Sequence, residues 1–455
     1  MEINQLRKLL VLFIISILIF TLHNVEAATK ETTPEASGFS QSGSGADPGY
    51  TGDIGTDVPL LTVPGRNGFD LPVSLSYSSG IRLDDEASWV GLGFNLGVGA
   101  ITRAVVNFPD DSQNGLFGPN NPSKDRNDQD LYSMSFPGGG GRFFYGCTKF
   151  DVNGNPICSN PNDYAWLTRS WGPTKIEPIA PNGLGNGIES WKVTTPDGTV
   201  YIFGKKVVTR IPVITSRTVT VSFSSTYKDV GSDKTNSEKN FDYAVAWYLT
   251  EIKSNDYVDD GNGLLDNNDK GSWVKISYTD KPCQDNEDGG LCDYYDPKVK
   301  GDMLNNPWIT GDLAWTRGYT FTGWDANLNN GYVYYTFQKR DIRKQRTYIT
   351  KIETPIARAD FNTLNIRHDD LEINDNPATP TSAPPALDTI ILYNTINGDF
   401  RLNKIKLNYA SSSEELAKGS EGSPNYGKLT LKSVKVYGEY DSISTPETKF
   451  DYGFN

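Results

Sequence analysis

Histidine is almost missing from this sequence, which contains only His23 and His368 in its 455 residues. A Ser-His-Asp or Cys-His catalytic device needs an imidazole as its general base. His23 lies in the N-terminal apolar segment, so any such device would depend on His368 alone. That residue stands in a polar stretch with no nucleophile motif beside it, and we interpret it as an ordinary surface histidine. The scarcity argues against histidine-dependent hydrolases.

Long apolar runs are absent after residue 22. Before that point, Leu9–Leu22 is a nearly continuous apolar stretch that follows the basic residues Arg7 and Lys8. Small residues suited to cleavage then follow, with Ala27 as the expected last residue of the leader. This order is typical of a secretory signal peptide, which we predict over residues 1–27. The run is short for a bilayer span, which disfavours the alternative of a membrane anchor. We therefore expect no transmembrane anchor in the mature chain, and a secreted, extracellular or cell-surface location.

Positively charged residues are outnumbered. The sequence has 43 Lys and Arg residues and 56 Asp and Glu residues, for a formal net charge of −13. An acidic surface does not attract the phosphate backbone of nucleic acid or an anionic membrane. We therefore expect no nucleic-acid partner. A net charge far from zero suits a protein that stays soluble outside the cell.

Cysteine is too sparse for a zinc site, since four spread cysteines and one mature histidine do not give ligand spacing. The four fall into two close pairs, Cys147 with Cys158 and Cys283 with Cys292. An even count in an exported protein predicts disulfides, and proximity favours the local pairing among three connectivities. The first pair flanks Asn153-Gly154, a turn signal that predicts a hairpin. Buried free thiols are the alternative interpretation.

What the sequence does contain favours a β protein. It holds 24 Tyr, 20 Phe and 9 Trp residues, many in short runs that alternate apolar and polar positions. The expected strands are 58–63, 71–77, 131–136, 142–145, 190–193, 200–203, 246–252, 273–278, 333–337, 347–352, 387–393, 402–409, 428–437 and 449–452. No helical crossover separates them, so an antiparallel arrangement is favoured over a parallel sheet. We predict a mainly β fold, a large antiparallel strand array of the meander, β-shell or sandwich-like type with few helices.

Composition and the strand pattern together divide the chain into regions. Residues 28–52 are rich in Thr, Glu, Ser and Gly and have little to bury, which predicts a disordered linker. A β-rich N-terminal region over residues 53–240 and a β-rich strand-array region over residues 241–455 should follow. The acidic runs Asp84–Glu86 and Asp125–Asp130 are interpreted as solvated faces.

The most distinctive stretch is Pro64–Arg103, which reads PGRNGFDLPVSLSYSSGIRLDDEASWVGLGFNLGVGAITR. Its pattern of a GR-x-G opening, an SLSY strand, SWVGLGF and a closing ITR resembles the N-terminal region of secreted RHS/YD-repeat proteins, including the SpvB-type region of insecticidal toxin-complex B components. Phe94 and Asn95 stand where a Trp-Ser pair is commoner. Looser similarity begins again at Thr194, Ala246 and Thr347.

The resemblance implies a structural role. In toxin-complex relatives such regions help to form a hollow β-shell around a C-terminal effector, so it implies a non-catalytic shell or delivery component. It also implies downstream RHS repeats after residue 455, or a toxin cargo, as partners. Similarity of fold is a weak warrant for function. A cell-surface adhesion or glycan-binding module is therefore the alternative, with a receptor or glycan as partner.

An enzyme is the third possibility. Glycoside hydrolysis needs only two carboxylates, and the sequence has 56 acidic residues. No local pattern selects a pair of them, so no catalytic residue is predicted.

The sharpest ligand signal is the segment 260–269, DGNGLLDNND. It follows the D-x-[DN]-G-x-x-D-x-x-D pattern of thrombospondin type 3 and dockerin-like calcium loops. Ca²⁺ prefers six to eight hard oxygen ligands, which acidic residues in a glycine-rich loop can supply. We predict one Ca²⁺ held by Asp260, Asn262, Asp266 and Asp269. The EF-hand glutamate is missing, because Gly271 occupies its position, and a solvated acidic turn is the alternative.

Overall fold

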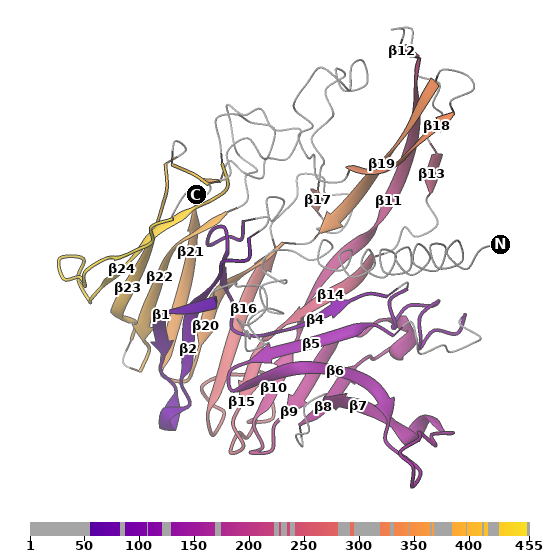
Figure 1. Ribbon diagram of the computed structural model, residues 1–455. Coiled ribbons are helices and arrows are strands. Elements are labelled where there is room, and N and C mark those ends of the chain that lie inside the picture. The colour runs from indigo at the N-terminus through magenta and orange to yellow at the C-terminus, as the bar shows by residue number, and fades with distance from the viewer. Residues whose placement is uncertain are drawn as a thin grey trace.

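The computed structural model shows a protein built almost entirely from β-strands (Figure 1). It describes residues 55–81, 87–106, 108–120, 129–168, 174–222, 227–228, 234–236, 242–280, 292–294, 319–327, 332–344, 346–364, 366–367, 385–396, 398–411, 414–416 and 427–452. Within these ranges no helix reaches seven residues, and the sheets are antiparallel. The predicted fold class is therefore confirmed. The expected signal peptide and linker, His368 and the acidic run Asp84–Glu86 lie outside the described residues.

The first large sheet has 11 strands in the order β25-β24-β23-β22-β21-β20-β16-β15-β10-β9-β8. Their bounds are Thr448–Lys449 (β25), Leu431–Tyr437 (β24), Phe400–Tyr409 (β23), Ala386–Asn394 (β22), Ala357–Leu364 (β21), Thr347–Glu353 (β20), Trp273–Asp280 (β16), Glu251–Lys253 (β15), Val200–Phe203 (β10), Ser190–Thr194 (β9) and Lys175–Ile179 (β8). Neighbours in the sheet are mostly neighbours in sequence, so this is the meander that the alternating pattern predicts. Its strands alternate buried apolar and more exposed polar residues, as a sheet with one covered face requires.

The second large sheet follows the order β17-β19-β11-β14-β4-β5-β6-β7, with β12 and β13 also paired to β11 and β18 to β19. The bounds are Cys292–Tyr294 (β17), Tyr332–Lys344 (β19), Lys205–Ser222 (β11), Asp242–Tyr248 (β14), Ala100–Ala104 (β4), Leu131–Phe136 (β5), Gly139–Cys147 (β6), Tyr164–Thr168 (β7), Tyr227–Lys228 (β12), Lys234–Asn236 (β13) and Tyr319–Asn327 (β18). Figure 1 shows β11 and β19 as a long ribbon that extends beyond the rest of the sheet. Here β4 lies beside β14, so the sequence order is broken.

The chain passes repeatedly between the two large sheets, and two of these passages bear on the expected strands. Strand β10 of the first sheet leads into β11 of the second, and β14 of the second leads back into β15 of the first. The single strand expected over residues 246–252 is therefore two strands in different sheets. Between them, the Leu249 amide donates to the Gly99 carbonyl at 3.0 Å, whereas the Thr250 amide donates to Ile202 at 2.8 Å. Both large sheets take strands from each side of the boundary predicted between residues 240 and 241, and that division stays a prediction.

The stretch Pro64–Arg103 lies where the sheets meet. It supplies β2 (Leu71–Ser78) and β3 (Phe94–Leu96), which form a three-stranded small sheet with β1 (Gly55–Val63), and it ends in β4 of the second large sheet. Most of its buried apolar residues belong to the same core cluster as residues of both large sheets. The motif thus builds the junction of the three sheets.

Hydrogen bonds fix this stretch against the first large sheet. The Leu387 amide donates to the Trp89 carbonyl at 2.8 Å, and the Leu92 amide donates to the Leu429 carbonyl at 2.8 Å. Between these contacts Gly91 adopts φ +118°, and a Cβ there would lie 3.1 Å from the Leu431 amide nitrogen. Only glycine fits both the backbone angle and the close approach. This explains one glycine of the SWVGLGF motif in physical terms.

Candidate functional site

The acidic loop, defined here as residues 254–272, connects β15 to β16 in the first large sheet. Backbone hydrogen bonds close its neck: Val258 and Lys270 exchange two at 3.0 Å each, and the Ser254 amide donates to the Ser272 carbonyl at 3.0 Å. Positive φ values at Gly261 and Gly263 allow the chain to reverse at the tip. The loop is therefore closed at its base by hydrogen bonds and projects from the β15–β16 hairpin.

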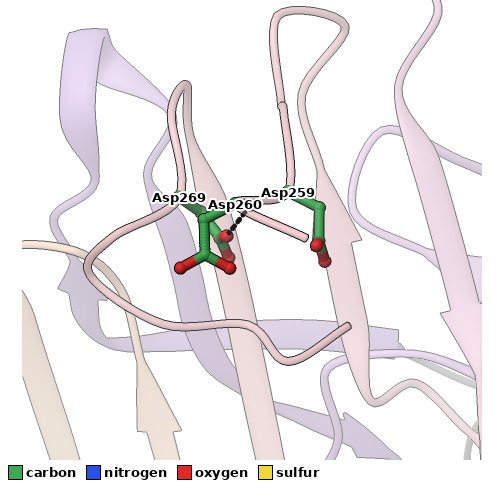
Figure 2. A group of neighbouring side chains, drawn as sticks. All are labelled: Asp259, Asp260 and Asp269. Carbon is green, nitrogen blue, oxygen red and sulfur yellow. Dashed lines mark hydrogen bonds between the residues drawn. The ribbon is translucent and has the colours of Figure 1, made fainter. Parts of the chain in front are cut away.

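Three carboxylates come together at the base of this loop (Figure 2). Asp259, Asp260 and Asp269 each offer an oxygen, and these oxygens all lie within 4.8 Å of one another. Asp259 and Asp260 are exposed, whereas Asp269 is only 2% exposed. We call these three residues the acidic cluster. It combines one fixed, buried carboxylate with two that face solvent.

Asp269 organises the loop around its side chain. Its carboxylate accepts hydrogen bonds from the Asp260 amide at 3.1 Å, the Asp266 amide at 3.0 Å and the Tyr257 hydroxyl at 3.0 Å. Loss of solvent disfavours its charge, but the amide hydrogen bonds outweigh that effect and hold the pKa of Asp269 below its usual value. Asp269 therefore stays ionised and keeps the loop in one conformation.

The predicted calcium ligands divide into two groups in the structure. Asp260 and Asp269 belong to the acidic cluster, whereas Asn262 and Asp266 bond to each other, with the Asn262 amide nitrogen 2.9 Å from Asp266 Oδ2. Their remaining oxygens accept backbone amides of the tip, from Leu264 at 2.7 Å and from Asn268 at 2.7 Å. Asn262 and Asp266 thus shape the tip and lie outside the cluster.

Asp259 is the member of the cluster that the sequence analysis missed. The calcium-loop pattern starts at Asp260, so the preceding acidic residue was not counted. In the structure Asp259 Oδ1 accepts the Gly261 amide at 2.7 Å and the Gly263 amide at 3.1 Å. The adjacent residues Asp259 and Asp260 were the sequence signal that could have revealed it, because neighbouring carboxylates at the neck of a loop can bind one ion together.

The acidic cluster has the donor chemistry that calcium requires. Three carboxylates supply hard oxygens and three negative charges, which would repel one another without a nearby cation. The loop is also joined to the turn between β1 and β2, because the Ser272 hydroxyl donates to the Arg66 carbonyl at 3.0 Å. An ion in this loop would therefore stabilise a contact between the first large sheet and the small sheet.

The described residues include one of the two cysteine pairs predicted to form disulfides. Cys147, at the end of β6, forms a disulfide with Cys158, 11 residues later in sequence. The loop between them turns at Asn153-Gly154 and places Val152 fully in solvent. Cys283 and the side chain of Cys292 lie outside the described residues, so their pairing stays a prediction.

No helix in the described ranges has the length and apolar character needed to cross a membrane. No protein-family model and no curated protein matches the sequence. Similarity appears instead among solved structures.

Crystal structures of TcdB2-TccC3, alone and with Cdc42, match 88% of this chain at 14% identity and a TM-score of 0.40. The match covers 16% of their length, so this chain spans a small part of those proteins. The N-terminal domain of effector protein SpvB from Salmonella typhimurium strain LT2 matches 84% of this chain, and 99% of that domain is covered, at 10% identity and a TM-score of 0.36. These toxin-complex and SpvB structures belong to the groups that the Pro64–Arg103 motif resembles.

Proposed function

We propose that this protein is a secreted, non-catalytic wall component of a toxin-type shell or delivery assembly. The observation that carries the proposal is the burial of the motif it shares with RHS/YD-repeat and SpvB-type regions. Trp89, Leu92 and Phe94 are each no more than 4% exposed, and they pack at the junction of the sheets. A motif that bound substrate or glycan would present polar or aromatic side chains to solvent. The buried motif instead packs the sheets against one another.

The shape of the sheets supports the same role. An 11-stranded antiparallel sheet offers a broad, continuous surface, and most of its neighbouring strands are also neighbours in sequence. Such a sheet is well suited to form one side of an enclosure. The acidic composition supports a location outside the cell and gives no means of holding nucleic acid.

The test is purification of an affinity-tagged form from the secreted fraction of its source. A wall component should elute in a particle larger than the 50.2 kDa chain, together with another polypeptide. That polypeptide should resist added protease while the particle is intact and be digested after urea opens it. The control is the same partner treated with protease in the absence of this chain.

Two other results would contradict the proposal. A secreted chain that is monomeric and binds one glycan on a glycan array would favour the adhesion alternative. Hydrolysis of a polysaccharide by the purified chain, abolished by a single carboxylate substitution, would establish the enzyme alternative.

We further propose that the acidic cluster binds one Ca²⁺. The observation that favours this is the convergence of Asp259, Asp260 and Asp269, with Asp269 fixed by three hydrogen bonds. The ion would supply the positive charge that the three carboxylates lack. Its role would be structural, because it would pin the loop that contacts Arg66. The experiment that tests this site opens the Discussion.

A further inference from the structure

A second group of charged residues is buried far from the acidic loop. Arg103 on β4 lies with Asp110 and Asp111 of the segment 108–120 and with Asp130, which immediately precedes β5. The exposed fractions are 2% for Arg103, 1% for Asp110, 6% for Asp111 and 1% for Asp130. We call these four residues the Arg103 cluster. The solvated face predicted over Asp125–Asp130 is therefore wrong at Asp130, because the Val106 and Asp110 amides hold its carboxylate in the interior.

Arg103 bonds to two sides of its pocket. Its Nη1 lies 2.6 Å from Asp111 Oδ1 and 3.6 Å from Asp130 Oδ2. Its Nε donates to the Ala244 carbonyl of β14 at 2.8 Å, and Nη2 donates to the same oxygen. The guanidinium also lies over the Trp247 ring, 5.2 Å from its centroid. One cation thus faces three carboxylates in a buried site.

Asp110 and Asp130 hold each other through their own backbone. The Asp110 amide donates to Asp130 Oδ2 at 2.9 Å, and the Asp130 amide donates to Asp110 Oδ2 at 3.1 Å. Asp130 Oδ1 accepts the Val106 amide at 3.0 Å. Asp110 Oδ1 is buried and has no hydrogen-bond partner among the described residues. A buried carboxylate oxygen with no donor is the place where a proton reduces the cost of burial most.

The cluster connects the two large sheets. Asp111 Oδ2 accepts the Ile188 amide at 2.8 Å, and Ile188 lies just before β9 of the first large sheet. The Ile188 carbonyl accepts the indole N–H of Trp247, on β14 of the second large sheet, at 3.1 Å. Arg103 and Asp111 therefore join β4, β14 and the approach to β9. Release of the segment 108–120 would break this connection.

Other titratable and charged groups face the pair from the surrounding elements. Within the described part of the chain these are Arg103 from β4, Asp111 from the segment itself, Tyr132 from β5 and Tyr243 from β14. Burial raises the pKa of the Tyr132 hydroxyl well above its usual value, so that group remains neutral. Arg103 is the one cation of this set, and its charge is engaged mainly by Asp111.

We propose that Asp110 and Asp130 form a one-proton latch: while the pair retains a proton, the segment 108–120 holds the two large sheets together, and loss of that proton loosens the junction. The latch rests on the geometry of two carboxyl groups that each accept the other's backbone amide, with Arg103 beside them. Asp110 Oδ1 is also buried without a hydrogen-bond partner among the described residues. It is independent of the proposed shell role and of calcium.

The direction of the pH effect follows from burial. Burial and, after it, the charge of Asp130 raise the pKa of Asp110 to about 8. Burial raises the pKa of Asp130 to about 6, against the opposing effect of Arg103. Both groups in an unfolded chain titrate near pH 4, so the closed form binds more protons than the open form between these values. The closed junction is therefore favoured in mild acid and weakens as the pH rises toward about 8.

The test compares hydrogen exchange in the segment 108–120 for the full chain, for Asp110→Asn and for Asp57→Asn, from about pH 5.5 to about pH 8.5. Asparagine is a permanently neutral substitute for protonated Asp110, and Asp57 is an exposed control on β1. Comparing variants at each pH removes the intrinsic pH dependence of exchange. Protection of the wild type relative to Asp110→Asn should fall by up to about tenfold per pH unit. Asp57→Asn should follow the wild type.

If protection from exchange changes with pH in parallel for the wild type and Asp110→Asn, the latch proposal is wrong. It is also wrong if Asp57→Asn diverges from the wild type as much as Asp110→Asn does. If Asp110→Asn does not fold, infrared spectroscopy of the wild type decides the question. A protonated carboxylic acid band should be present near pH 6.5 and lost by about pH 9. Its absence near pH 6.5 would contradict the proposal.

Discussion

Replacing Asp259 by asparagine tests the calcium site at the residue where the structure and the sequence pattern disagree. Asparagine keeps the side-chain oxygen that accepts the Gly261 and Gly263 amides, and it removes one of three clustered charges. Without calcium, the variant should be as stable as the wild type or slightly more stable, because repulsion inside the cluster is reduced. With calcium, the stabilising increment should be largely lost.

The size of the increment follows from ligand linkage. Extracellular calcium modules bind with dissociation constants of about 10⁻⁴ to 10⁻³ M. At about 5 mM calcium, RT ln(1 + [Ca²⁺]/Kd) is then about 1 to 2 kcal/mol of added free energy of unfolding. For a cooperative unit of this size, the melting temperature should rise by about 1 to 3 °C. Magnesium should give less, because it prefers a smaller and stricter geometry.

The assay is differential scanning calorimetry of the wild type, Asp259→Asn and Asp266→Asn, each with calcium and with a chelator. Asp266→Asn is the matched control, because Asp266 lies in the same loop but outside the acidic cluster. It should keep the calcium increment, even if the loop tip is weakened. If Asp266→Asn loses the increment and Asp259→Asn keeps it, the assignment of ligands is wrong. If the wild type shows no increment, the loop is a solvated acidic turn.

Three further predictions concern the motif, the disulfide and the leader. Gly91→Ala should lower the free energy of unfolding by about 1 to 3 kcal/mol, because the backbone angle is unfavourable for alanine and its Cβ would meet Leu431; urea denaturation measures this, and an unchanged midpoint would refute it. Reduction of Cys147–Cys158, or its replacement by two serines, should cost about 2 to 3 kcal/mol from chain entropy in its short loop; the same denaturation curves check it. N-terminal sequencing of the secreted protein should begin near Ala28, and material that begins at Met1 would contradict the predicted signal peptide.

Strand positions were predictable because a half-buried strand leaves a period of two in the sequence. The pairs β9–β10, β5–β6 and β22–β23 all arise where alternating runs flank a turn signal, and the structure confirms these pairings. The limit appears at residues 246–252. Residues 246–249 are continuously apolar, because Trp247 and Leu249 are both buried where the chain passes from one sheet to the other. Periodicity cannot reveal that one apolar run serves two sheets.

The candidate sites show the same limit for polar residues. The acidic loop was recognisable because its residues are close in sequence and follow a known spacing. Asp259 was missed because hydrogen bonding, and not spacing, decides which side chains point into the cluster. Arg103 stands in the ITR that closes the motif, but no local pattern predicted the Arg103 cluster, since contacts such as that of Asp111 with Ile188, 77 residues apart, form only through folding.

The sequence by itself determined the β class, the places of most strands, the acidic loop and the motif that resembles RHS/YD-repeat and SpvB-type regions. Each of these is set by neighbours within a few residues, through alternation, turn chemistry or close spacing. Only the tertiary structure decided which strands share a sheet, which carboxylates converge and which are buried. Those outcomes depend on contacts such as Arg103 with Ala244, 141 residues apart, where burial and pairing are properties of the assembled sheets and of no local segment.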